Sequence, residues 1–349
     1  MTEGPEATFL AEMIYQYFRG KQLRKVRICA GRYKTHGPGK GFVAFQRVLP
    51  LRLTDVYKKG KVIFLIFEKN WVLIVKMGMT GWFYRGADRP LFRSQPNVTF
   101  QFENEELHFA DFRNFGTLLF TNQVLDVMEE MDRLAPDVLN PYTTYGEIAE
   151  RVAAAKEKVG KRDMLVGDAL MDQTLLMSGI GNILKSEVLY AAGVSPRRGL
   201  KDVDEDEWRR IVSAAKAVSK KTLAVLERRK GESRDEYAGL RRVYGKEQDP
   251  EGRRVIAYQS ADGRATSRPH LRRTTAEPSR ARQKVHFPRR RSTLDPETLG
   301  RAQGERGGRL KKGMLLLSQR QHGLGFGAIP PATDCPLGES AHGNPEECL

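Results

Sequence analysis

The spacing of the apolar residues changes character near residue 126. From about 21 to 125 the chain carries short runs of β-branched and aromatic residues, such as VIFLIF (62–67) and NVTFQF (97–102), separated by Gly, Asn, Pro or charged residues. Such runs predict strands, and several at this spacing are typical of an antiparallel sandwich or barrel. Beyond residue 126 the apolar residues recur at helical spacing. The sequence therefore predicts an α+β multidomain protein.

We expect four segments. An N-terminal β-sandwich domain covers 1–125 and opens with an amphipathic helix at 7–20. A helical domain covers 126–243, and a small β-hairpin follows over 244–270. The remaining stretch, 271–349, is rich in Arg, Gly, Ser and Pro with little periodicity, so we predict a disordered basic tail.

The charge of the chain points to a polyanionic partner. Its 349 residues include 59 Lys and Arg against 43 Asp and Glu, which gives a formal net charge of +16. The segment 271–320 alone holds 14 Lys and Arg against 4 acidic residues. Nucleic acid is the first partner to consider for such a protein, and a basic surface that serves only solubility is the alternative.

The composition also limits the compartment. No run of about eighteen apolar residues is present, so we expect no membrane span. The start carries Glu3 and Glu6 rather than the basic residues of a secretory signal. Three cysteines lie far apart in the sequence, which fits a reducing compartment better than a disulfide framework.

The first residues, MTEGPE, allow two interpretations. Thr2 and Glu3 are acceptors suited to the N-cap of a helix, and Pro5 suits a first helical turn. Alternatively, the terminus is a reagent in which a free amine lies beside a carboxylate. This stretch alone leaves both interpretations open.

The stretch GIGNILKSEVL (179–189) combines a glycine turn with the start of a helix. Glycines let backbone N–H groups approach a phosphate, and a helix N-terminus attracts anions. Asn182 could add a side-chain donor and Lys185 a positive charge. An ordinary turn between two helices is the alternative, because Gly and Asn are common there.

Three further turns carry residues suited to DNA. The KKGK motif (58–61) is either a solvated strand edge or a phosphate clamp that uses Lys61. Met79 lies in a tight GMTG turn, and Arg113 and Phe115 lie in the turn DFRNFG. Side chains at such tips can fill the space that a nucleotide leaves when it is flipped out of the stack, although burial in a core is the alternative.

Together these motifs resemble the Fpg/Nei family of DNA glycosylases over residues 2–266. The resemblance rests on the ordered set M-x-E-G-P-E, KKGK, GMTG, DFRNFG, the helix-two-turns-helix stretch MDQ…GIGNILKSEVL, and VYGKE before the hairpin. Any one motif would be weak, but the ordered set is highly specific.

The resemblance implies a catalytic role for the terminus. In this family the initiator Met is removed and the new terminal amine, here that of Thr2, attacks the sugar and forms a Schiff base. An α-amino group has a pKa near 7.7–8.0, against about 10.4 for lysine, so more of it is neutral at pH 7. Glu3 would act as general acid and base, and Lys61 would contact the phosphate and sugar of the lesion nucleotide.

The resemblance also implies a DNA-binding set. Glu6 would support the terminus, three wedge residues would fill the void in the stack, Asn182 would bind a phosphate with Lys185 adding charge nearby, and an arginine of the hairpin would contact DNA. The set is Glu6, Met79, Arg113, Phe115, Asn182, Lys185 and Arg264.

Three departures from the family pattern matter. Thr2 stands where the family usually has Pro, so the nucleophile would be a primary amine. The four zinc-binding cysteines of the family's finger are absent from 244–270, so we expect a zincless finger, no metal and no cofactor. The connection GESRDEYAGLRR (231–242) is shorter than the lesion-capping loop of enzymes for oxidised purines, which favours oxidised pyrimidines.

We therefore expect a bifunctional DNA glycosylase and apurinic/apyrimidinic lyase of base excision repair that acts on damaged DNA as a monomer. It would be intracellular and DNA-associated, in the nucleus of a eukaryote or the cytoplasm and nucleoid of a bacterium. The alternative is a non-catalytic damaged-DNA-binding protein on the same scaffold. An RNA-binding protein would explain the charge but not the acidic terminus.

The basic tail generates a first prediction. Deleting 271–349 should make DNA binding less dependent on salt, because fewer counterions are released on binding, while the excision chemistry remains. The slope of log Kd against log salt concentration measures this on an undamaged duplex. An unchanged slope would show that the tail adds nothing to DNA affinity.

Overall fold

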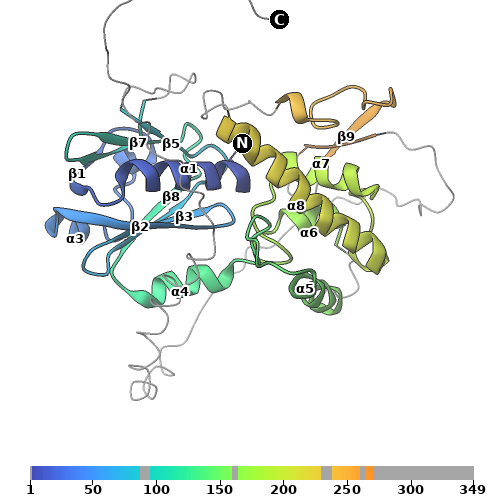
Figure 1. Ribbon diagram of the computed structural model, residues 1–349, viewed down its shortest axis with the longest axis horizontal. Helices are drawn as coiled ribbons and strands as arrows, with labels where there is room; N and C mark the ends of the chain where they lie inside the picture. The colour runs from blue at the N-terminus through green and yellow to red at the C-terminus, as the bar shows by residue number, and fades with distance from the viewer. Residues whose placement is uncertain (1, 87–94, 159–163, 229–237, 260–264, 270–349) are drawn as a thin grey trace, which may run out of the picture. The chain divides into compact units, whose positions relative to one another are not determined.

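A computed structural model of the protein shows the arrangement of its helices and strands (Figure 1). It describes residues 2–86, 95–158, 164–228, 238–259 and 265–269. The tail 271–349 and Arg264 lie outside these residues. No helix in the described part is long and apolar enough to cross a membrane.

The first helix, α1 (Gly4–Phe18), starts three residues earlier than the apolar pattern predicted. Pro5 lies in its first turn, where the missing N–H costs nothing. Its buried face includes Leu10, Ile14 and Phe18, spaced so that they lie on one side of the helix. This face packs into the main hydrophobic core, among side chains of the sheet.

Eight antiparallel strands form the N-terminal part, in the order β5-β7-β6-β1-β2-β3-β4-β8. The strands are β1 (Gln22–Ile28), β2 (Leu51–Lys59), β3 (Val62–Phe67), β4 (Val72–Lys76), β5 (Trp82–Arg85), β6 (Val98–Phe102), β7 (Glu106–Ala110) and β8 (Thr117–Thr121). Only two residue pairs join β1 to β2, so the sheet divides there into two halves of four strands. One core contains side chains from both halves, and the predicted antiparallel β-sandwich is confirmed.

Helices dominate the chain after β8. They are α4 (Val124–Arg133), α5 (Tyr145–Lys158), α6 (Val166–Met171), α7 (Asn182–Ala192) and α8 (Glu205–Arg228), with short helices α2 (Arg32–Thr35) and α3 (Phe42–Arg47) earlier and 3₁₀ turns η1 (Leu200–Asp202) and η2 (Ala238–Leu240) later. A second core forms from α5 to α8 and the loops that join them. The helix α8 packs against both α7 and α1, so it links the helical part to the sandwich (Figure 1).

A two-stranded hairpin follows, as the sequence predicted. Its strands, β9 (Val255–Gln259) and β10 (Ala265–Pro269), pair antiparallel from Val255↔Pro269 to Gln259↔Ala265. The strand β10 lies beside α7. The hairpin therefore lies close to the helix that follows the glycine turn.

Two carboxyl groups face each other where α1 meets α8. Burial, followed by the charge and hydrogen bond of Glu227, raises the pKa of Glu12 to about 7 against the opposing effect of Lys58. A folded-state pKa above the ordinary value of 4.5 means that the folded protein binds this proton more tightly than the unfolded chain. The resulting stabilisation is complete below about pH 4.5 and is lost as the pH rises through about 7.

Removing this charge should stabilise the protein in alkaline solution. Glu12→Gln should raise the free energy of unfolding by about 1–2 kcal/mol at pH 8.5, once the screening of a partly exposed carboxyl is allowed for, and change it little at pH 4.5. Urea unfolding at the two pH values measures this. Glu150→Gln, at an exposed position of α5, is the control and should show no pH-dependent gain.

Candidate active site and nucleic-acid interface

The amino-terminal segment is buried and held by the turn between β4 and β5. The backbone nitrogen of Thr2 donates to the Met79 carbonyl at 2.9 Å. The Thr2 hydroxyl donates to the Gly81 carbonyl at 2.6 Å. The atom that would become the terminal amine after loss of Met1 therefore lies against the turn that carries Met79.

The Glu3 carboxylate reaches the first turn of α7. Its Oε1 accepts a hydrogen bond from the Ile183 N–H and its Oε2 one from the Leu184 N–H, each at 2.9 Å. The first N–H groups of a helix lack partners within the helix, and the positive end of the helix dipole favours an anion there. Glu3 is fully buried. Glu3 stands at the N-cap position of α1. Its carboxylate also accepts backbone N–H groups at the start of α7, a helix about 180 residues away in the sequence.

Glycines make this contact possible. A Cβ atom on Gly181 would lie 2.3 Å from Oε1 of Glu3, so any side chain there would displace the carboxylate. The Gly4 N–H donates to the Gly179 carbonyl at 2.7 Å, and Gly179 has a φ of +99°. The sequence suggested that this glycine turn approaches a phosphate. In the structure the anion that lies against it is the Glu3 carboxylate.

Three residues of the expected DNA-binding set lie inside the protein. Glu6 is buried and accepts a hydrogen bond from the Glu3 N–H at 3.1 Å, which supports the terminus. Asn182 is 3% exposed, and Lys185 is fully buried in α7. In this conformation the Lys185 ammonium group does not lie at the surface, and its expected contribution of positive charge near a phosphate stays a prediction.

The KKGK turn is tied to the segment that precedes α5. Lys58 forms a buried ion pair with Asp137 at 2.7 Å, and the Gly60 N–H donates to the same carboxylate at 2.8 Å. A Cβ atom on Gly60 would lie 2.7 Å from that of Ser178, so the turn also packs against the glycine turn before α7. Sequence reasoning missed Asp137, because a single Asp in a loop carries no motif signal.

The three lysines of this turn therefore have different environments. Lys59 donates to the Met131 carbonyl at 2.7 Å. Burial, followed by the nearby charge of Arg151, lowers the pKa of Lys59. Lys61 is half-buried, and it is the lysine that the resemblance places at the lesion phosphate.

The predicted wedge turns are held together by one buried carboxylate. Asp111 is fully buried and accepts hydrogen bonds from the Thr80 hydroxyl and, at 2.6 Å, from the Gly116 N–H. Its own N–H donates to Oδ1 of Asn97 at 2.6 Å. The GMTG and DFRNFG turns therefore form one unit.

Two of the three predicted wedge side chains, those of Met79 and Arg113, are in contact. Arg113 is exposed and donates to the sulfur of Met79 at 3.9 Å, while Met79 is half-buried. Phe115 is 57% exposed. Phe112, which the motif analysis did not single out, is also exposed, at 55%. Neither aromatic ring lies in the core, which removes the alternative interpretation of Phe115.

Comparison with known proteins shows the family to which the chain belongs. Residues 1–118 match the formamidopyrimidine-DNA glycosylase N-terminal domain, and residues 134–233 match the formamidopyrimidine-DNA glycosylase H2TH domain. The chain is 26% identical over 218 residues to a formamidopyrimidine-DNA glycosylase of Desulfitobacterium hafniense, which covers 61% of this chain and 75% of the relative. A relative with the same name from Listeria innocua is 27% identical over 228 residues, covering 64% and 79%.

Solved structures share the fold. One is Lactococcus lactis Fpg bound non-covalently to DNA containing an AP site, with a TM-score of 0.63 and 22% identity over 76% of this chain and 97% of that chain. Another is MutM with DNA containing carbocyclic 8-oxo-G, with a TM-score of 0.62 and 23% identity over 77% and 98%. These matches place the chain among the DNA glycosylases of base excision repair. It belongs to the formamidopyrimidine-DNA glycosylase family, also called Fpg/Nei.

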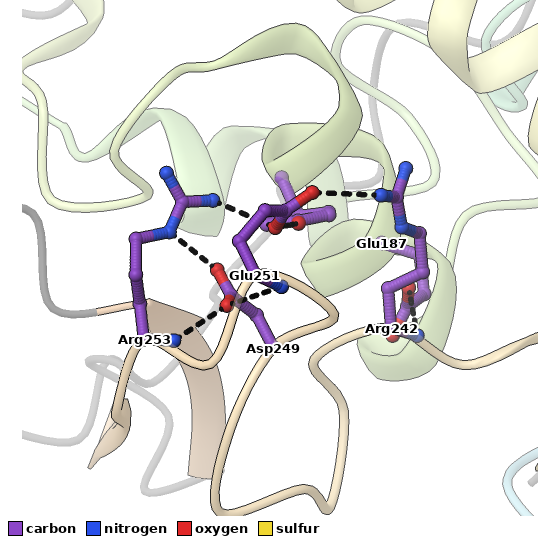
Figure 2. A network of polar contacts seen from close by, with 6 residues as sticks. Glu187, Arg242, Asp249, Glu251 and Arg253 are labelled. Atoms are coloured by element: carbon purple, nitrogen blue, oxygen red, sulfur yellow. Dashed lines mark hydrogen bonds and ion pairs between the residues drawn. The ribbon is translucent and has the colours of Figure 1, made fainter.

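The zinc of the family's finger does not fit this chain. Residues 244–270 contain no cysteine. Within the described ranges, no three His, Cys, Asp or Glu side chains lie together where they could hold a metal ion. Figure 2 shows what lies at the base of the hairpin instead: carboxylates of Glu187, Asp249 and Glu251 that contact backbone N–H groups and arginines.

The contact between Glu3 and Gly181 can be tested directly. Gly181→Ala should displace the Glu3 carboxylate from α7 and lower the single-turnover excision rate by about 100-fold, because small displacements of reacting groups cost that much. Gly146→Ala is the matched control, since its new Cβ would meet nothing closer than 3.8 Å. A Gly181→Ala protein with wild-type excision would show that Glu3 need not contact α7.

Proposed function

We propose that the protein is a bifunctional DNA glycosylase and apurinic/apyrimidinic lyase that excises oxidised bases, pyrimidines in particular, and nicks the strand by β,δ-elimination. One observation carries the proposal. The nitrogen of Thr2 lies 2.9 Å from the carbonyl of Met79, a wedge residue, and the next residue is the buried acid Glu3. Nucleophile, acid and wedge would thus belong to one small region.

The chemistry would begin after removal of Met1. The lone pair of the Thr2 amine attacks C1′ of the lesion nucleotide, and the base leaves with the electrons of its glycosidic bond and takes up a proton. Opening of the sugar ring and loss of a proton from nitrogen give an imine. A primary amine such as that of Thr2 suffices for this step. Removal of the C2′ proton then lets the 3′ phosphate leave, and the second elimination releases the 5′ phosphate.

Glu3 would protonate the sugar ring oxygen and relay protons between steps. Its contacts with Ile183 and Leu184 support this role, because they fix the orientation of the carboxylate of the residue that follows Thr2. Lys61 would bind the phosphate and sugar of the lesion nucleotide. The contacts of Lys58 and Lys59 with Asp137 and Met131 support that assignment, because they fix the turn that carries Lys61.

The wedge residues would fill the space left by the flipped nucleotide. The exposure of Arg113 and Phe115, and the contact of Arg113 with Met79, support this role. Flipping costs a few kcal/mol, and less for a damaged base, so a side chain that replaces the lost stacking lowers the cost further. Asn182 would bind a DNA phosphate and Arg264 would contact DNA, as the resemblance implies.

The preference for pyrimidines follows from the short segment 231–242 between α8 and the finger, most of which lies outside the described residues. Relative excision rates on oligonucleotides carrying one oxidised pyrimidine or one oxidised purine test this preference. Faster excision of the purine would reverse the proposed preference but leave the rest of the mechanism intact.

The nucleophile can be identified by trapping. Borohydride added during reaction with an oligonucleotide carrying one oxidised pyrimidine should reduce the imine and leave a covalent product. Mass spectrometry of the cross-linked peptide should place the adduct on the amine of Thr2. Glu3→Gln should reduce the trapped yield by about 100-fold, which is within the range of a general acid–base contribution.

The same experiment distinguishes the rival function. Tight binding of the lesion without any cross-link would indicate a non-catalytic damaged-DNA-binding protein. A cross-link on a lysine instead of Thr2 would keep the lyase activity but reassign the nucleophile. Thermal melting of Glu3→Gln is the control, because this variant also disturbs the cap of α7.

A further inference from the structure

The chain reverses direction in a tight turn just before β9. The Val255 N–H donates to the Glu247 carbonyl at 2.7 Å, and the Asp249 N–H donates to the Arg253 carbonyl at 2.9 Å. The Gly252 N–H donates to the Asp249 carbonyl at 2.9 Å. Gly252 has a φ of +75°, a conformation that side chains disfavour. This turn sets the direction in which the finger hairpin starts.

The Asp249 side chain closes this turn from inside. It is buried, and its Oδ1 accepts hydrogen bonds from the Glu251 N–H at 3.1 Å and the Arg253 N–H at 2.8 Å. Its Oδ2 pairs with Nε of Arg253 at 2.7 Å. One carboxylate therefore gathers two backbone N–H groups and a guanidinium group.

A second carboxylate attaches the preceding segment to α7. Oε2 of Glu187 accepts a hydrogen bond from the Arg242 N–H at 2.8 Å, and Oε1 accepts from the N–H groups of Val243 and Tyr244 at 3.1 and 2.8 Å. Three residues further along α7, on the same face, the Tyr190 hydroxyl donates to Glu251. Both ends of the segment that leads into the finger are thus held on one helix.

The exposed ion pairs of this network stabilise it less than the buried carboxylates do. The side chains of Arg242, Glu251 and Arg253 are each nearly half exposed, and ion pairs at such positions are worth little in water (Figure 2). A buried carboxylate that accepts several backbone N–H groups differs, because its loss removes the acceptor of all of them at once. The network therefore depends on Asp249 and Glu187.

We propose that Asp249 and Glu187, which we call the carboxylate clasp, position the finger hairpin in place of the family's zinc. The clasp fixes the turn at 247–255 and holds the segment before it on α7, beside which β10 lies. The finger is then ready for DNA without any metal. The clasp itself is independent of the proposed function, but its effect on DNA binding rests on that function.

The first measurement is amide hydrogen exchange of the free, full-length protein. Asp249→Ala should speed exchange in the peptide that covers 247–257 by about tenfold or more, since two amides lose their acceptor. Peptides from β3 and β4 should exchange as in the wild type. Glu247→Ala is the matched control, because the side chain of Glu247 is exposed.

The second measurement is affinity for a duplex that carries one abasic-site analogue. Wild-type affinity should be the same with and without EDTA. Asp249→Ala should bind about tenfold more weakly than the wild type, and Glu247→Ala within about twofold of it. Asp249→Asn keeps one acceptor oxygen but loses the ion pair with Arg253, so it should fall between the two.

The outcomes of the exchange and affinity measurements have different consequences for the proposal. Wild-type exchange in Asp249→Ala would overturn the clasp, and weaker wild-type binding in EDTA would show that a metal holds the finger. Faster exchange with unchanged affinity would overturn the positioning role alone. If the wild type binds no damaged DNA, the proposed function fails, whereas the exchange measurement still tests the clasp.

Discussion

The hydrogen bonds between the Glu3 carboxylate and the first turn of α7 are the contact on which the rest of the site depends. The sandwich and the helical part each have their own core, so something specific must fix the amino-terminal segment between them. A buried carboxylate and two unpaired helix N–H groups satisfy one another, and each would be costly to leave alone. Gly181 makes the approach possible, and Thr2 is held at the same time by the Met79 turn.

The same physical device recurs around the site. Asp111 joins the two wedge turns, Asp137 holds the turn that carries Lys61, and Asp249 closes the turn before the finger. In each case a buried carboxylate accepts at least one backbone N–H group from a loop that lacks regular secondary structure. Loops fixed in this way present side chains with little conformational freedom, which suits the wedge role proposed for Met79, Arg113 and Phe115.

Much of the fold could be predicted from local pattern. The runs VIFLIF and NVTFQF coincide with β3 and β6, and the change to helical spacing near residue 126 falls close to the start of α4 at Val124. The strands β2 and β5 were not singled out. In β2 the charged residues Arg52, Asp55, Lys58 and Lys59 interrupt the apolar alternation, and β5 has only four residues. Pairing with neighbouring strands, rather than composition, makes both of them strands.

The sequence by itself determined the succession of a β half and an α half, and the ordered motifs that identify the family. It also predicted wedge residues, because Met79, Arg113 and Phe115 lie in turns whose residue types are distinctive. Only the tertiary structure decided which charges remain at the surface: Lys185 is a motif residue like Lys61, yet packing buries it completely, and Lys58 is paired with Asp137. Burial depends on neighbours from distant parts of the chain. For the same reason, only the fold could reveal that Glu3 contacts a helix about 180 residues away.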